Sequence, residues 1–179
     1  MANLTHTIDK GYALIFYIII LTQIIIIVNK FMKGKKVGME DLSEVYNELI
    51  MEHSMNSYNK KKLESADCCE IGHNPNCGDE ITLELKLDGD KIQDMAFSGH
   101  GCAISQASTS IMIDTLKGRT IEEAKEIIKT FIEMIKREKT DEEELKKLED
   151  AIAFRNVANM PARVKCALLA WHTLENMLP

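Results

Sequence analysis

The clearest pattern in the chain is a regular alternation of apolar and polar residues over positions 80–87. Such alternation is typical of a strand with one buried face. The Asp-Gly-Asp run at 88–90 predicts a hairpin turn, because these residues tolerate the positive φ that tight turns require. Residues 91–98 should return as the partner strand, with a bulge or twist near 95–97, where the alternation slips. Residues 66–71 predict a further short strand.

Helical spacing of apolar residues predicts the remaining elements. An amphipathic helix is expected over residues 41–53, and others follow Cys102, Thr120 and Pro161. Thr120 and Glu123 form a capping box, and proline suits the first turn of a helix. The charged run at 138–150 predicts a solvated short helix.

The first 38 residues differ from the rest. Residues 12–28 form a 17-residue, largely apolar run that lysines follow. This length is at the lower limit for a membrane span, and the lysines would leave the domain on the cytoplasmic side. No small-residue cleavage site follows, which argues against a signal peptide. We favour a second interpretation, in which residues 1–38 are upstream sequence translated from a start codon set too early. The working domain is then 39–179, in the cytoplasm.

Charge and cysteine content narrow the function. The net charge is −6, and because residues 1–38 carry +4, residues 39–179 carry −10. An acidic domain is a poor candidate for nucleic-acid binding. The five cysteines are an odd number and lack a secretory context, so a disulfide framework is not expected. Reduced thiols instead serve as metal ligands, nucleophiles or core residues. The cysteines are Cys68, Cys69, Cys77, Cys102 and Cys166.

Cys77 and Asp79 lie two residues apart on a turn built by Pro75 and Gly78. Proline fixes one backbone angle, and glycine lets the chain turn sharply. In an extended chain, residues i and i+2 point the same way. We therefore expect the thiol and the carboxylate to face one common point at the start of the strand.

Two further cysteines occur in specific settings, Cys102 after Gly-His-Gly and Cys166 within Pro-Ala-Arg-Val-Lys-Cys. With Cys77 and Asp79 they make a possible site of three thiolates and one carboxylate. Thiolates suit zinc, Cu(I) or iron–sulfur clusters, and four ligands match tetrahedral zinc. The carboxylate should be the ligand most easily displaced. The two nearby helix starts should lower the pKa of the Cys102 and Cys166 thiols.

The spacing alone leaves this site unproven, because the thiols are 25 and 64 residues apart and no C-x2-C pair is present. Other polar residues rank below the cysteines. His73 and His100 could ligate or gate, but such histidines are more often polar loop residues. Arg163 and Lys165 flank Cys166 and are either solvated charges or stabilise a thiolate or persulfide there.

Cys68 and Cys69 should point to opposite faces of the short strand at 66–71, one packed and one exposed. We interpret both as lying near the site at best.

Three segments together resemble the IscU/SufU family of iron–sulfur cluster assembly proteins, which share the NifU N-terminal domain. They are Asn74–Asp79, Gly99–Ser105 and Pro161–Cys166. The likeness covers essentially all of residues 39–179. Within the family the chain is similar to the SufU branch, because Lys165 stands where the IscU branch has a histidine. The long interval between Cys102 and Cys166 also resembles the SufU pattern.

The resemblance implies an α+β fold, a small three-stranded antiparallel sheet with helices packed on it. It implies zinc held by Cys77, Asp79, Cys102 and Cys166. It also implies that Cys77 accepts sulfane sulfur from a cysteine desulfurase, a pyridoxal-phosphate enzyme, and passes it on to downstream iron–sulfur assembly proteins.

The sequence is compatible with three functions. In the first, a zinc-dependent sulfurtransferase exchanges a ligand and frees Cys77 as a thiolate that takes the sulfur. In the second, the same three thiolates hold an iron–sulfur cluster on a scaffold that delivers it to apo-proteins. In the third, zinc only stabilises a small domain. Lys165 favours the first over the second, and the resemblance argues against the third.

Overall fold

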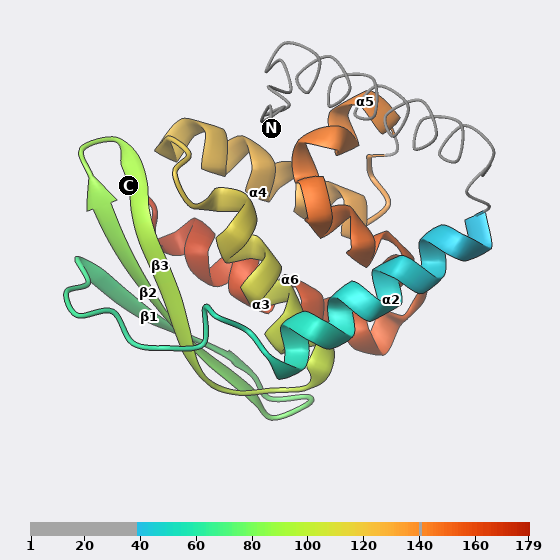
Figure 1. Ribbon diagram of the computed structural model, residues 1–179, viewed down its shortest axis with the longest axis horizontal. Coiled ribbons are helices and arrows are strands. Elements are labelled where there is room, and N and C mark those ends of the chain that lie inside the picture. The colour runs from blue at the N-terminus through green and yellow to red at the C-terminus, as the bar shows by residue number, and fades with distance from the viewer. Residues whose placement is uncertain (1–38, 140) are drawn as a thin grey trace, which may run out of the picture. The chain divides into compact units, whose positions relative to one another are not determined.

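Three strands form an antiparallel sheet in the order β1-β2-β3 (Figure 1). They are β1 Cys68–Asn74, β2 Asp79–Asp88 and β3 Lys91–His100. The computed structural model describes residues 39–139 and 141–179. The chain divides into the units Met1–Leu42 and Ser43–Pro179, and the architecture below is that of the second. The predicted leader, residues 1–38, lies outside the described residues, so both interpretations of it stay predictions.

The alternation in β2 has the expected effect. Ile81, Leu83 and Leu85 are fully buried, and the residues between them, Thr82 and Glu84, are half-buried. The predicted hairpin is confirmed, since Asp88 pairs with Lys91 across a two-residue turn in which Gly89 has φ +62°. Strand β1 begins two residues later than predicted and runs on to Asn74.

The predicted bulge at 95–97 is wrong. The register of β2 and β3 shifts between Lys86 and Leu87, opposite Ile92 and Asp94, so the extra residue lies earlier in β3. Met95, Ala96 and Phe97 are buried in regular pairing. The alternation fades there because the segment before β1 lies along β3, and the Phe97 N–H donates to the Asn59 carbonyl at 2.9 Å.

The helices confirm the predicted order and extend it. They are α2 Met39–Met55, α3 Ala103–Leu116, α4 Ile121–Ile135, α5 Glu142–Leu145, the 3₁₀ helix η1 Lys146–Asn159 and α6 Pro161–Met177. Helix α6 packs on β1 and β2, with α3 beside it against β3. Helix α4 packs on α6, and η1 packs on α3, α4 and α6. The predicted α+β fold is therefore confirmed.

The core joins these layers through aromatic stacking and hydroxyl hydrogen bonds. Trp171 of α6 stacks on Phe131 of α4, with ring centroids 3.9 Å apart. Its indole N–H donates to Ser108 Oγ at 3.0 Å, and that hydroxyl donates to the Ala167 carbonyl at 2.7 Å. Ten of the 14 residues of α3 are buried, more than a single apolar face would supply.

The charged run at 138–150 is only partly the solvated helix that was predicted. Its charged side chains are largely exposed, but Leu145 and Leu148 are fully buried. These two leucines anchor α5 and η1 in the core. Over the described ranges 39–139 and 141–179, none of the helices combines the length and apolarity that a membrane crossing requires.

Candidate metal centre

Asn74 organises the turn between β1 and β2. It pairs with Asp79 across the hairpin, and its carbonyl accepts the N–H groups of Gly78 at 2.9 Å and Cys77 at 3.3 Å. Its side-chain oxygen accepts the Asn76 N–H at 3.2 Å, the local bond that favours asparagine in turns. Gly78 has φ +71°, which permits the reversal. The turn thus presents the exposed Cys77 beside the first residue of β2.

Asp79 ties the turn to the start of α3. Its Oδ1 accepts the Cys102 N–H at 2.8 Å, and the Cys102 thiol lies 3.7 Å from Oδ2. Two glycines allow this approach. Gly99 has φ +105°, and a Cβ there would lie 2.2 Å from the Glu80 carbonyl oxygen. A Cβ at Gly101 would lie 3.3 Å from Asp79 Oδ1.

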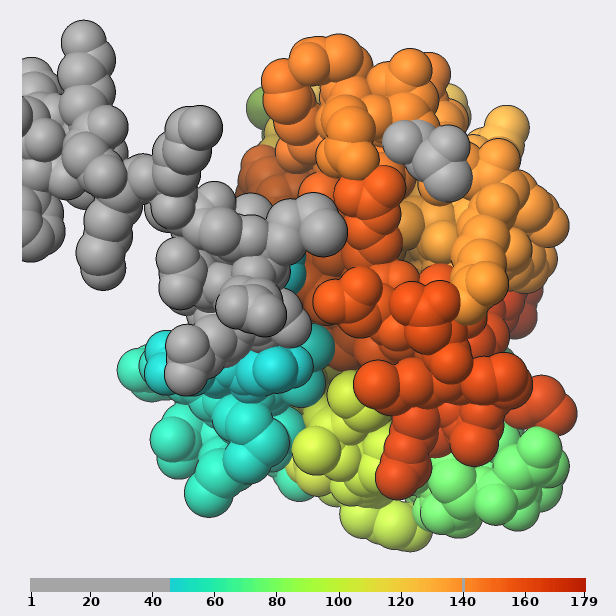
Figure 2. All heavy atoms as spheres, turned by 90° about the vertical axis from the view of Figure 1, so that its right-hand side faces the viewer, coloured from blue at the N-terminus to red at the C-terminus, as the bar shows by residue number. Residues whose placement is uncertain are grey.

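Cys166 completes the group from α6. Its Sγ lies 3.4 Å from Cys77 Sγ, and the Asn74 side-chain amide donates to it at 3.8 Å. One ligand atom each from Cys77, Asp79 and Cys166 lie within 4.8 Å of one another. Figure 2 shows the three contributing segments side by side at the lower edge of one face, the green turn, the yellow-green start of α3 and the red-orange start of α6. Two thiols and a buried carboxylate at this spacing could hold a metal ion.

Burial and hydrogen bonding act in opposite directions on these groups. Burial alone would raise the pKa of Asp79, but hydrogen bonds from the Cys77 thiol, the Cys102 N–H and the other two thiols lower its pKa below the ordinary value. The pKa of the Cys166 thiol is raised well above the ordinary value, first by burial and then by its neighbours Cys77 and Cys102. The prediction that the helix start lowers the pKa of Cys166 is therefore wrong. Cys166 is the sixth residue of α6, beyond the first turn, and it is 1% exposed.

The structure brings the four predicted ligand residues to one place, with Cys102 at its margin. Cys102 is the N-cap residue of α3, and its thiol contacts Asp79 but stands outside the tight group of the other three. Arg163 and Lys165 are exposed on α6. Within the described residues neither forms an ion pair, which leaves both side chains available to an incoming group.

The other predicted residues are not part of the group of ligand atoms that Cys77, Asp79 and Cys166 form. His73 and His100 are exposed at the ends of β1 and β3. Cys68 is half-buried and Cys69 exposed, as their predicted opposite orientations require. Burial, with the charge of Asp67 and with Cys69 adding to it, raises the pKa of Cys68.

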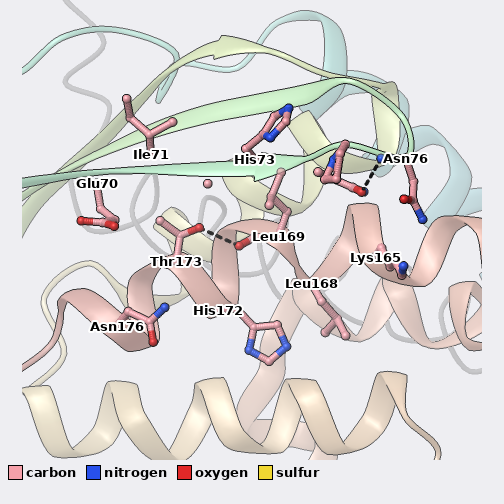
Figure 3. Close-up of a pocket in the computed structure, with 13 residues that line it drawn as sticks. Glu70, Ile71, His73, Asn76, Lys165, Leu168, Leu169, His172, Thr173 and Asn176 are labelled. Carbon is pink, nitrogen blue, oxygen red and sulfur yellow. Dashed lines mark hydrogen bonds between the residues drawn. The ribbon is translucent and has the colours of Figure 1, made fainter.

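A groove of about 470 Å³ adjoins the centre between β1 and α6. Figure 3 shows Lys165 and Asn76 at one end of it and Asn176 and Glu70 toward the other. Strand β1 and helix α6 approach each other closely here, as the space at Gly72 shows. A Cβ added to Gly72 would lie 2.3 Å from Thr173 Oγ1. The groove therefore leads along the edge strand to the turn that carries Cys77.

Comparison with known proteins places this geometry in a family. Residues 45–167 match the NifU-like N-terminal domain, and this segment includes all four predicted ligands. The chain belongs to the NifU-like N-terminal domain family. The predicted resemblance to the IscU/SufU proteins is thereby confirmed, since the chain covers nearly the whole length of several of them.

Among these relatives, the zinc-dependent sulfurtransferase SufU of Bacillus subtilis is 41% identical over 135 residues, 75% of this chain and 90% of that protein. The iron–sulfur cluster assembly scaffold protein IscU of Thermotoga maritima is 40% identical over 134 residues, 75% of this chain and 92% of that one. In Fervidobacterium islandicum, a protein named as an iron–sulfur cluster assembly scaffold for the SUF system has a solved structure. It is 46% identical, with a TM-score of 0.70, over 74% of this chain and 95% of that one.

Two residues of this NifU-like domain were missed as members of the centre. Asn74 was part of a recognised segment, but no role was predicted for its side chain, which donates to Cys166. Asn before Pro-Asn-Cys-Gly was a signal for a side-chain-stabilised turn. Ser105 lies in the helix beside Asp79, and the sequence carries no signal that its hydroxyl is buried without a partner.

Proposed function

We propose that this chain acts in iron–sulfur cluster assembly as a zinc-dependent sulfurtransferase, with Cys77 as the sulfur acceptor. The observation that carries the proposal is the pairing of an exposed thiol with buried partners. Cys77 is exposed on a turn, while Cys166 Sγ, 3.4 Å away, and Asp79 are each 1% exposed. A carrier needs access, and fixed ligands need rigid support.

The donor set suits zinc. Three cysteines and one carboxylate supply four ligands, and zinc in proteins is commonly tetrahedral with sulfur ligands. Two thiolates on one such ion stand about 3.8 Å apart, close to the 3.4 Å between the Cys77 and Cys166 sulfurs. We assign Cys77, Asp79, Cys102 and Cys166 as the ligands. Bound zinc would keep its cysteine ligands deprotonated at neutral pH.

The transfer itself balances without an added oxidant or reductant. The Cys77 thiolate attacks the terminal sulfur of a persulfide on the cysteine desulfurase. A new sulfur–sulfur bond forms at Cys77, and the desulfurase persulfide bond breaks. The bonding electron pair leaves with the desulfurase cysteine, which is released as a thiolate. The exposed Arg163 and Lys165 would stabilise the negative charge on the transferred sulfur.

The partner is therefore a cysteine desulfurase, and downstream iron–sulfur assembly proteins would receive the sulfur. The pyridoxal phosphate belongs to the desulfurase. The names of relatives such as the Bacillus subtilis sulfurtransferase support this assignment.

A scaffold function is the alternative, and the relatives named as IscU scaffolds favour it. The same three thiolates would then ligate an iron–sulfur cluster. Lys165 argues against this alternative, because the resemblance to the IscU branch implies a histidine at this position that could join a cluster site.

Two measurements test the proposal. Protein purified without oxygen should contain one zinc ion per chain and show no visible chromophore. Adding it to the cognate desulfurase should raise the turnover of cysteine, because removal of the persulfide frees the desulfurase thiol. Cys69→Ser, at an exposed cysteine outside the centre, should behave like the unaltered protein. A brown protein with iron and sulfide, or a desulfurase rate that stays flat across the titration, would contradict the proposal.

A further inference from the structure

Ser105, the third residue of α3, has an unusual environment. Its side chain is 1% exposed, and within the described part of the chain its Oγ is the one buried side-chain polar atom without a hydrogen-bond partner. A buried hydroxyl without a partner destabilises the state that contains it. Such an atom calls for an explanation, because buried polar groups in folded proteins are normally paired.

Other hydroxyls in the helices show what Ser105 lacks. The hydroxyls of Thr109, Thr115, Thr130 and Thr173 each donate to the carbonyl one turn back, at 2.8 to 2.9 Å. For Ser105 the corresponding carbonyl is that of Gly101. This carbonyl already accepts the Gln106 side-chain amide at 2.8 Å. The local partner of Ser105 is thus engaged by its neighbour.

The carboxylate of Asp79 lies on the other side of Gly101 from this hydroxyl. A Cβ at Gly101 would lie 3.2 Å from Ser105 Oγ and 3.3 Å from both Cγ and Oδ1 of Asp79. The hydroxyl and the carboxylate therefore border the same small space, which exists because residue 101 is glycine. Oδ1 is the oxygen turned toward α3, since it accepts the Cys102 N–H, while Oδ2 contacts the Cys102 thiol.

The two oxygens of the Asp79 carboxylate have different surroundings. Oδ2 lies 3.7 Å from the Cys102 thiol, on the side of the predicted ligands. Oδ1 accepts the Cys102 N–H at 2.8 Å and has room for a second donor, because an oxygen of a carboxylate accepts two hydrogen bonds. The Ser105 hydroxyl borders the same space and is buried without a partner.

We propose that Ser105 is a positioning residue for Asp79, donating its hydroxyl proton to Oδ1 in the metal-loaded centre. The carboxylate would then be fixed through Oδ1 by two donors from α3, with Oδ2 directed at the thiols. No covalent bond forms or breaks, and no proton is transferred. Ligating carboxylates are commonly held by such outer hydrogen bonds. This inference rests on the metal site of the proposed function.

The test compares Ser105→Ala with the unaltered protein and with Ser110→Ala. Ser110 is a buried serine of the same helix, bonded to His53 and Ser57. Zinc affinity is measured by competition with a chromophoric chelator, and thermal unfolding is recorded with and without zinc. Ser105→Ala should lower the zinc affinity about tenfold, the lower end of the effect of losing an outer hydrogen bond.

Its metal-free melting temperature should stay the same or rise, because an unpaired buried hydroxyl is removed and alanine favours helix. Ser110→Ala should instead lower the melting temperature and leave the zinc affinity unchanged. The absorption spectrum of the Co(II)-substituted protein should change in Ser105→Ala alone. In an Asp79→Ala background, Ser105→Ala should have no further effect on zinc affinity.

Equal zinc affinities for Ser105→Ala and the unaltered protein would overturn the inference, as would an undiminished effect in the Asp79→Ala background. Sulfur on Cys77 is assayed in parallel after incubation with desulfurase and cysteine. If Cys77 carries sulfur while Ser105→Ala leaves the zinc affinity unchanged, the positioning role of Ser105 is refuted and the sulfur-transfer function is retained. If the affinity falls as expected while Cys77 stays free of sulfur, the transfer function fails and the role of Ser105 stands.

Discussion

The helices α3 and α4 begin at opposite ends of the same sheet and are capped in different ways. Helix α4 begins beside the β2–β3 hairpin with a local capping box, in which Thr120 and Glu123 satisfy each other's backbone N–H groups. Helix α3 begins at Cys102, whose side chain caps nothing. Its N-cap N–H is bound at 2.8 Å by Asp79, a residue of β2.

We call these regions the hairpin end, residues 88–94 with 117–123, and the thiol end, residues 74–79 with 99–105 and Cys166. At the hairpin end the polar groups satisfy one another locally, as Lys117 and Asp94 do at 2.6 Å. At the thiol end a buried carboxylate supports both a helix and a group of thiols, and one hydroxyl stays unpaired. Polar groups that are fully hydrogen-bonded to one another, as at the hairpin end, stabilise the fold. At the thiol end some polar groups lack protein partners and can instead interact with a bound metal.

The largest contrast should appear in metal binding. Asp79→Ala removes a ligand and the acceptor of the Cys102 N–H, so zinc affinity should fall on the order of a hundredfold or more, given how much free energy four ligands share. Asp94→Ala removes a carboxylate at the hairpin end and should leave the affinity unchanged. Chelator competition on both variants measures the difference. Equal affinities for Asp79→Ala and the unaltered protein would remove Asp79 from the ligand set.

A pair of glycine substitutions tests the backbone at each end. Gly99→Ala places a Cβ 2.2 Å from the Glu80 carbonyl oxygen at φ +105°, so it should destabilise the protein by about 2 to 3 kcal/mol. Gly89→Ala also has a positive φ, +62°, but its Cβ meets nothing within 4 Å, so the cost should be about 1 kcal/mol. Urea unfolding of the two variants gives both values. A smaller loss for Gly99→Ala than for Gly89→Ala would refute the close approach at the thiol end.

The capping box at the hairpin end should contribute stability alone. Thr120→Ala removes the side-chain acceptor of the Glu123 N–H and should cost about 1 kcal/mol of unfolding free energy. Zinc affinity should not change, because the box lies at the other end of the sheet. A fall in zinc affinity in this variant would show that the two ends are coupled.

The smallest effect concerns acid stability. Burial opposes ionisation of Asp94, but hydrogen bonds from Lys117 and the Met95 N–H, with the positive charge of Lys117, outweigh it and lower the pKa of Asp94. A lowered pKa in the folded state stabilises the fold above the ordinary aspartate pKa of about 4, and this stabilisation is lost as the pH falls through the folded value.

Asp94→Asn should therefore flatten the loss of stability below about pH 5 by at most about 1 kcal/mol, since the pair is partly exposed. Unfolding in urea from pH 7 down to pH 3 measures it. Parallel pH profiles for the variant and the unaltered protein would contradict the assignment.

The hairpin end could be predicted almost entirely from the sequence. The Asp-Gly turn and the Thr120–Glu123 box are local patterns, formed by residues that are close along the chain. Strand β2 could also be predicted, because apolar residues alternate with polar ones along it and the apolar residues form its buried face. The bulge was misplaced, because a segment from elsewhere covers β3 and hides the alternation.

The thiol end could be predicted in its residues but not in its contacts. Cys77 and Asp79 are near neighbours in sequence, so their common direction followed from strand geometry. The approach of Cys166 and its raised pKa depend on how α6 packs on β1, which no local pattern encodes. The unpaired hydroxyl of Ser105 depends on which neighbour occupies the Gly101 carbonyl, a detail of side-chain packing.

In the proposed function, Cys77 carries the transferred sulfur while Cys102 and Cys166 act as fixed ligands. The direct test incubates the single variants Cys77→Ser, Cys102→Ser and Cys166→Ser with desulfurase and cysteine, then maps added sulfur by mass spectrometry of peptides. Cys69→Ser serves as the control at an exposed cysteine outside the centre. We expect sulfur on Cys77 that persists in Cys166→Ser and disappears in Cys77→Ser. Sulfur found mainly on Cys166 would contradict it and move the acceptor to α6.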